Sequence, residues 1–147
     1  MASRTFWSSA MNFDSSSFIA ERGLIEVLEK LSSTVVCTES RVLFSQGSSP
    51  TGLYVLRRGK ATLSMESPTG GTLMSITLQP GSLLGLPALI GNEPYTLTAI
   101  AEENSELGFV SREDFNSLMI SDPSMAGRVL RVLAAEVRAA RHAISEF

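Results

Sequence analysis

The chain has 147 residues, of which 44% are hydrophobic and 18% are charged, and its formal net charge is −3 at pH 7. This composition is typical of one globular domain with a sizeable core. The acidic balance argues against direct binding of nucleic acid, because phosphate contacts need clustered lysine and arginine. No apolar run is long enough to span a bilayer, and the single cysteine, Cys37, cannot form an internal disulfide. We therefore expect a cytoplasmic protein that makes no membrane contact.

The polar side chains offer no catalytic or metal-binding set. His142 is the only histidine and Cys37 is the only cysteine, so one chain cannot build a histidine-rich metal site or an iron–sulfur cluster. Cys37 lies among Val35, Val36 and Thr38, a setting that favours a buried structural thiol. No acid–base pair or nucleophile triad is visible. We expect no enzymatic activity, no catalytic residue and no bound metal.

The first residues of the chain, 1–17, are rich in serine with interspersed aromatic side chains. We expect a loosely ordered arm there, whose aromatic rings either dock on the domain or stay exposed. The domain itself is expected over residues 18–147. It begins with an amphipathic helix over about 22–31, because the apolar residues follow helical spacing. These residues are Leu24, Ile25, Val27, Leu28 and Leu31.

Between residues 35 and 111 the pattern changes to short strands separated by turn signals. Many short strands at this spacing predict a sandwich, jelly roll or small barrel. The expected strands are 35–38, 41–44, 53–57, 60–66, 72–78, a very short one within 81–85, 95–101 and 105–110. The fold class is therefore mainly β, with about eight strands and flanking helices.

The stretch from Gly81 to Ala101 is expected to form a binding cassette. Gly81 and Gly85 bracket the very short strand. Pro87 then begins a short helix over residues 88–90, since proline is tolerated in the first helical turn. The free N–H groups at the start of such a helix, facing a strand, attract anions.

Two helices are predicted to close the domain. Ser111 begins the first with a capping box completed by Asp114. Asp122 caps the second, which has Pro123 at its first position and extends over about 122–146. This last helix carries two apolar stripes. One, expected to face the barrel, contains Met125, Val129, Val132 and Ala143. The other, expected to meet a partner helix in a homodimer, contains Leu130, Leu133, Val137, Ala140 and Ile144.

Four motifs carry a resemblance to a known family. They are Val42-Leu-Phe-Ser-Gln-Gly47, Leu53-Tyr-Val-Leu-Arg-Arg-Gly59, Pro80-Gly81-Ser-Leu-Leu-Gly85 and the closing helix from Asp122-Pro123. Over about residues 22–146 the sequence resembles the cyclic-nucleotide-binding domain of the bacterial Crp/Fnr superfamily, the sensor of catabolite activator protein and related transcriptional regulators. The resemblance implies a β-roll or jelly-roll barrel (a double-stranded β-helix) with an N-terminal helix and a long C-terminal dimerisation helix.

The resemblance also implies a phosphate cassette, from which this sequence departs. In the family, a glutamate after the glycine takes the ribose hydroxyl, and an arginine before a serine or threonine neutralises the cyclic phosphate. Gly85 and Thr96 match, but Leu86 stands at the glutamate position and Tyr95 at the arginine position. No lysine or arginine lies between residues 60 and 112, and burying a phosphate without a cation is costly. We expect a degenerate phosphate cassette.

The resulting pocket is expected to favour an apolar or neutral ligand, or none. Its predicted lining is Leu84, Gly85, Leu86, Pro87, Ala88, Leu89, Tyr95, Thr96 and Leu97, with contributions from Val137, Arg138, Ala140 and Arg141 of the last helix. The leading interpretation is a non-enzymatic sensor of an unknown small molecule, or a dimerisation module, without a cofactor. The alternative is a genuine cyclic-nucleotide receptor whose phosphate is held by Gly85, Thr96 and an arginine of the last helix.

The chain ends at Phe147, directly after the last helix. The family's transcription factors continue with a helix-turn-helix domain at this point, and no such domain is present in this sequence. Two interpretations stay open: a stand-alone sensor, or a sensor separated from a DNA-binding part.

Overall fold

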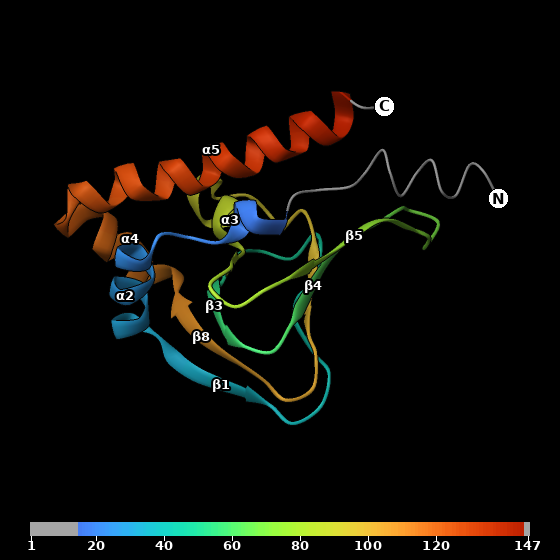
Figure 1. The fold of residues 1–147 in the computed structure, drawn as a ribbon, viewed down its shortest axis with the longest axis horizontal. Helices are drawn as coiled ribbons and strands as arrows, with labels where there is room; N and C mark the ends of the chain where they lie inside the picture. The colour runs from blue at the N-terminus through green and yellow to red at the C-terminus, as the bar shows by residue number, and fades with distance from the viewer. Residues whose placement is uncertain (1–14, 146–147) are drawn as a thin grey trace.

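Two antiparallel β-sheets pack against each other and are flanked by helices (Figure 1). The computed structural model describes residues 15–145, with side chains described up to residue 139. Within these residues, the first sheet has the strand order β1-β8-β3-β6 and the second the order β2-β7-β4-β5. The predicted mainly β architecture of about eight strands with flanking helices is confirmed.

The strands of the first sheet are β1 (Ser33–Cys37), β8 (Ser105–Ser111), β3 (Gly52–Arg58) and β6 (Leu83–Leu84). Those of the second sheet are β2 (Arg41–Phe44), β7 (Thr98–Ala101), β4 (Ala61–Glu66) and β5 (Thr72–Leu78). In β5, Met74, Ile76 and Leu78 are buried and alternate with exposed residues, as expected for a strand with one face on the core. In β3, residues 52–56 are buried on both faces, because this strand has the barrel interior on one side and helices on the other.

The helices form a layer along the first sheet. They are the 3₁₀ helix η1 (Ser15–Phe18), α2 (Arg22–Leu31), α3 (Leu86–Gly91), α4 (Arg112–Ser121) and α5 (Pro123–Ser145). The long helix α5 lies across one side of the molecule, above α3 (Figure 1). None of the helices within residues 15–145 is long and apolar enough to cross a membrane.

The predicted helix boundaries follow from local side-chain chemistry. Helix α2 covers the predicted residues 22–31 and buries Leu24 and Leu28. The Ser111 hydroxyl accepts a hydrogen bond from the Asp114 N–H at 3.1 Å, which confirms the predicted cap of α4. At the start of α5, the Asp122 carboxylate accepts a hydrogen bond from the Ser124 N–H at 3.2 Å.

The structure corrects the expected strand over 95–101, because β7 begins only at Thr98. The backbone of Tyr95 is used elsewhere: its N–H donates to the Ser48 carbonyl at 2.9 Å, and its carbonyl accepts from the Gly47 N–H at 2.8 Å. These bonds tie residue 95 to the turn after β2 and not to β4. Two other boundaries differ from prediction. The short helix spans residues 86–91 and not only 88–90, and η1 begins inside the segment 1–17 expected to be an arm.

Candidate functional site: a pocket between the barrel and the long helix

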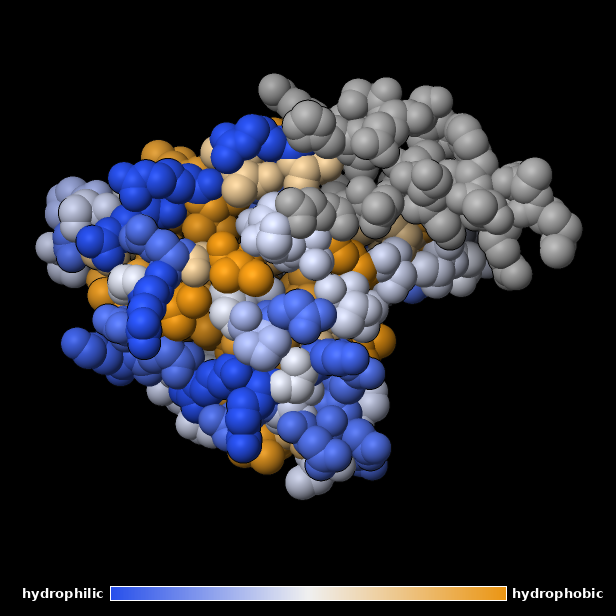
Figure 2. All heavy atoms as spheres, in the orientation of Figure 1, coloured by the Kyte–Doolittle hydropathy of each residue, from blue (hydrophilic) through white to orange (hydrophobic). Residues whose placement is uncertain are grey.

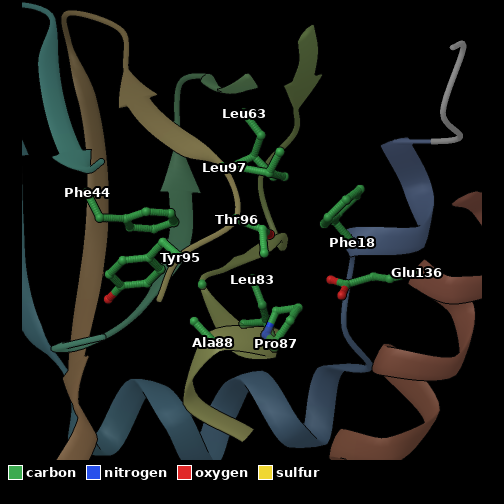
Figure 3. Close-up of a pocket in the computed structure, with 11 residues that line it drawn as sticks. Phe18, Phe44, Leu63, Leu83, Pro87, Ala88, Tyr95, Thr96, Leu97 and Glu136 are labelled. Carbon is green, nitrogen blue, oxygen red and sulfur yellow. The ribbon is translucent and has the colours of Figure 1, made fainter. Parts of the chain in front are cut away.

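A small pocket lies between the barrel, α3, η1 and α5 (Figure 3). Its lining residues come from segments far apart in the sequence. They are Phe18, Phe44, Leu63, Leu83, Gly85, Pro87, Ala88, Tyr95, Thr96, Leu97 and Glu136. The volume is about 40 Å³, which leaves room for roughly three water molecules. Pro87 and Thr96 are the exposed members of the lining and mark the side on which the pocket reaches solvent.

Gly85 sets the direction in which the chain leaves β6 and enters α3. Its φ is +94°, a left-handed conformation that glycine adopts without the steric cost of a Cβ. A Cβ built there would lie 3.2 Å from both the Gly52 carbonyl oxygen and the Tyr95 ring. The glycine therefore allows the cassette to pack directly on the barrel, and its match to the family's glycine has a structural reason.

Tyr95, where the resemblance leads us to expect an arginine, belongs to the barrel wall. Its ring stacks on Phe44 with centroids 3.9 Å apart and planes 14° apart. Its hydroxyl donates to the Gly52 carbonyl at 2.7 Å and accepts from the Thr51 N–H at 3.0 Å. The hydroxyl points away from the pocket (Figure 3). The side chain thus presents an aromatic face to the pocket and keeps its polar atom for the backbone.

The remaining barrel side of the pocket is almost entirely apolar. Leu63 and Leu97 lie at one end and Ala88 and Pro87 at the other (Figure 3). Thr96 is exposed, and its hydroxyl makes no hydrogen bond to the described residues. This hydroxyl is therefore the polar group that the barrel side leaves available to a ligand.

Glu136 of α5 brings a carboxyl group into the pocket, opposite the barrel wall and beside Phe18 of η1 (Figure 3). Its Oε1 atom is buried and has no hydrogen-bond partner among the described residues. Burial raises the pKa of this carboxyl from 4.5 to about 8, since a low-dielectric environment disfavours the charged form. The pocket therefore contains an acid that is mostly protonated at neutral pH.

The sequence analysis missed Glu136, although a signal was present. The residues that α5 buries are Met125, Val129, Val132 and Ala139. Their spacing of three and four residues places position 136 on the same face of the helix. An acidic residue within a buried apolar stripe was the sign that this helix contributes a polar group to the interior.

Six of the predicted lining residues meet at the pocket: Gly85, Pro87, Ala88, Tyr95, Thr96 and Leu97. Three others, Leu84, Leu86 and Leu89, are buried in the two hydrophobic cores and do not line it. Leu86, where the resemblance leads us to expect a glutamate, is completely buried in the core beneath the helices.

The predicted contributions of α5 to the pocket fall elsewhere on the helix. Val137 and Arg138 are exposed and do not line the pocket. Ala140 and Arg141 lie beyond residue 139, outside the described side chains. The helix meets the pocket through Glu136, one residue before the predicted set, because the buried stripe sets the angle at which α5 packs.

The outer face of α5 carries exposed apolar side chains. Leu130 and Val137 are 60% and 51% exposed, whereas Leu133 is partly buried and packs on the core beneath the helices. The other predicted seam residues, Ala140 and Ile144, lie outside the described side chains. Within the described part, α5 thus has one apolar face on its own domain and part of a second face open to solvent.

Comparisons with known proteins identify the family of the domain. Residues 34–122 match the family model described as the cyclic nucleotide-binding domain. The cyclic AMP receptor protein of Thermus thermophilus is 29% identical over 102 residues, which make up 69% of this chain and 47% of that protein. The chain therefore spans about half the length of this curated relative.

Two solved structures extend the similarity to the fold. The catabolite activator protein of Thermus thermophilus superposes with a TM-score of 0.73 at 24% identity, over 85% of this chain and 59% of that chain. The N-terminal domain of a transcriptional regulator from Streptomyces coelicolor superposes with a TM-score of 0.64 at 27% identity, over 84% of this chain and 87% of that chain.

Proposed function

The chain belongs to the cyclic nucleotide-binding domain family, and we propose that its pocket does not hold a cyclic nucleotide by the family's charged contacts. The family is a regulatory and non-enzymatic one, and this domain is related to the sensors of Crp-type transcriptional regulators. We assign to this chain the role of a sensor for a small, predominantly apolar molecule, coupled to a homodimer through α5.

The state of Tyr95 is the observation that carries this proposal. A cyclic phosphate bears a full negative charge and needs a cation or several free donors when it is buried. The Tyr95 hydroxyl is already bonded to the backbone of Gly52 and Thr51, so the residue offers the phosphate an aromatic ring and no donor. None of the described lining residues is a lysine, arginine or histidine.

The size and charge of the pocket support the same proposal. Roughly three water molecules, the content that the pocket volume allows, correspond to about 90 Å³ of liquid. This is the size of a molecule with about five heavy atoms, much smaller than a nucleotide. The Glu136 carboxyl adds to the discrimination, because its ionised form would repel a phosphate.

The position of the pocket suggests how binding would be transmitted. One wall belongs to the barrel and the other to η1 and α5. A ligand that fits one placement of α5 better than another shifts the population toward that placement. The exposed Leu130 and Val137 on the other side of the same helix would then carry the shift into a partner helix.

Calorimetric titration with cyclic AMP and cyclic GMP tests the ligand part of the proposal. We expect no binding at micromolar concentrations of either nucleotide. Micromolar binding that is abolished in Arg141→Ala and retained in Arg138→Ala would overturn the proposal and assign the chain as a genuine cyclic-nucleotide receptor.

Light scattering at tens of micromolar protein tests the dimer. We expect a dimer for the unchanged chain and a monomer for the double variant Leu130→Glu/Val137→Glu. Ile120→Glu is the matched control, because Ile120 is 82% exposed on α4 and lies outside the predicted seam. A monomeric unchanged chain, or a double variant that stays dimeric, would contradict dimerisation through α5.

A further inference from the structure

One carboxyl oxygen of Glu136 is buried but makes no hydrogen bond to the described residues that would stabilise the fold. Buried polar atoms in folded proteins almost always have a hydrogen-bond partner, so an exception calls for an explanation. The Oε1 atom has no partner among the described residues, although it lies in a pocket and not in a sealed core. A ligand that enters the pocket would therefore meet the Glu136 side chain.

The charged side chains on the elements around Glu136 are either paired with another residue or exposed to solvent. On α5, Arg128 is paired with Glu21 at 3.1 Å, and Arg131 and Arg138 are exposed. The 3₁₀ helix η1 carries no acidic or basic residue. The barrel and α3 contribute to the lining only apolar residues, Thr96 and Tyr95, whose hydroxyl is held by the backbone. Within residues 15–139, the chain thus supplies no counter-ion to this carboxyl.

The surroundings of the carboxyl define the chemistry that fits. Above pH 8, where the carboxyl is ionised, an anion is disfavoured because its charge would repel that of the carboxylate. An ammonium group would form a charge-assisted hydrogen bond with the carboxylate, which is stronger than a bond to a neutral donor. The ring of Phe18 lies beside the carboxyl (Figure 3), where an aromatic face also attracts a cation. Leu63, Leu97 and Ala88 leave space for a short apolar body.

We propose that the pocket binds a small aliphatic amine in its ammonium form, with Glu136 as the counter-ion and the Phe18 ring beside the cation. This inference rests on the proposed function and names the ligand class of the same pocket. Because Glu136 is mostly protonated in the empty pocket at neutral pH, binding of an ammonium ion displaces the carboxyl proton into solvent.

Three probes with the same branched four-carbon skeleton test the ligand class: isobutylamine, isobutanol and isobutyrate. Titration at pH 8.5, followed by amide chemical shifts of the unchanged chain, is expected to show the amine binding at least 10-fold more tightly than the alcohol, from the difference between charged and neutral hydrogen bonds. The carboxylate probe is expected not to bind. Equal affinity for the amine and the alcohol, or tighter binding of isobutyrate, would overturn the proposal.

Two variants identify the carboxyl responsible. Glu136→Gln keeps the shape of the side chain and is expected to weaken isobutylamine binding about 10-fold while changing isobutanol binding by less than about threefold. Glu103→Gln is the matched control, since Glu103 is an exposed carboxylate in a loop, and is expected to leave both affinities unchanged. Equal effects of the two variants on amine binding would contradict the assignment.

A measurement on the unchanged chain makes the test independent of any variant. Because the proton must leave before the ammonium is paired, amine affinity is expected to rise about 10-fold per pH unit from pH 6 to near pH 8 and then to level off. A flat profile from pH 6 to pH 8.5 would overturn the proposal. The cyclic-nucleotide titration decides the proposed function separately, so a pocket that binds neither nucleotide nor amine contradicts this inference alone.

Discussion

The two walls of the pocket treat their polar atoms in opposite ways. On the barrel wall, the Tyr95 hydroxyl is bonded to the backbone of Gly52 and Thr51, and its ring stacks on Phe44. On the helix wall, one oxygen of the Glu136 carboxyl has no partner within the part of the chain that the structure describes. The difference indicates that the polar atom of the barrel wall stabilises the fold, whereas the carboxyl of the helix wall keeps an oxygen that is free to bind a ligand.

The helix wall also has a connection that the barrel wall lacks. Glu136 lies one residue before Val137, which is 51% exposed and lies about 100° further around α5. The surface view shows apolar patches on the described part of the molecule, separated by polar side chains (Figure 2). A change at Glu136 is therefore expected to act on the outer face of α5, while a change at Tyr95 acts first on the stability of the barrel.

The largest expected effect on stability is that of removing the Tyr95 side chain from the barrel wall. Tyr95→Ala deletes a ring that is only 3% exposed, together with the hydrogen bonds of its hydroxyl. We expect the free energy of unfolding to fall by about 4–5 kcal/mol, the cost of a large cavity with unpaired backbone groups. Urea unfolding measures this change. A loss below about 1 kcal/mol would remove the structural role assigned to this wall.

The next effect concerns the helix wall and depends on pH. The pKa of Glu136 is raised to about 8 in the folded chain. Below pH 4.5 the carboxyl is protonated in both the folded and the unfolded chain, so it does not lower the free energy of unfolding there. As the pH rises from 4.5 to 8, the unfolded state ionises first and the folded state loses stability. Glu136→Gln removes this loss. The full pKa shift corresponds to a loss of about 5 kcal/mol in the free energy of unfolding. Because the side chain is partly exposed, we expect Glu136→Gln to be more stable than the unchanged chain by about 3 kcal/mol at pH 9.

Unfolding free energies measured from pH 4 to pH 9 provide the test. The glutamine variant and the unchanged chain should have the same stability near pH 4 and diverge upward from there, with the variant more stable. Glu103→Gln is the control and should follow the unchanged chain throughout. Parallel curves for Glu136→Gln and the unchanged chain would mean that this carboxyl reaches solvent.

A smaller effect isolates the Tyr95 hydroxyl from its ring. Tyr95→Phe keeps the stacking on Phe44 but leaves the Gly52 carbonyl and the Thr51 N–H without this partner. We expect a loss of about 2 kcal/mol, as for buried polar groups left unpaired. Thermal or urea unfolding measures it. If the phenylalanine variant were as unstable as the alanine variant, the hydroxyl and not the ring packing would dominate the wall.

The smallest effect is expected at Thr96. Its side chain is exposed and its hydroxyl has no partner among the described residues, so Thr96→Val should change stability by less than about 0.5 kcal/mol. The same unfolding assay measures this change. A loss above about 1 kcal/mol would show that this part of the barrel wall is also committed to the fold.

Much of the fold was predictable because its signals are local. The apolar spacing of residues 22–31, the Ser111 and Asp122 caps and the alternation in β5 each depend on neighbours a few positions away. The same holds for the glycine at position 85, where the chain turns with a positive φ. These features determined the element order and placed most of the cassette residues together.

The sequence by itself determined that residue 95 is a tyrosine and that no lysine or arginine lies between residues 60 and 112. Only the tertiary structure decided what Tyr95 does, because its partners Gly52 and Phe44 belong to distant strands. Packing also decided the role of Glu136. A carboxyl on a helix becomes a buried acid only when that face of the helix is covered, and the cover comes from Phe18 and the barrel.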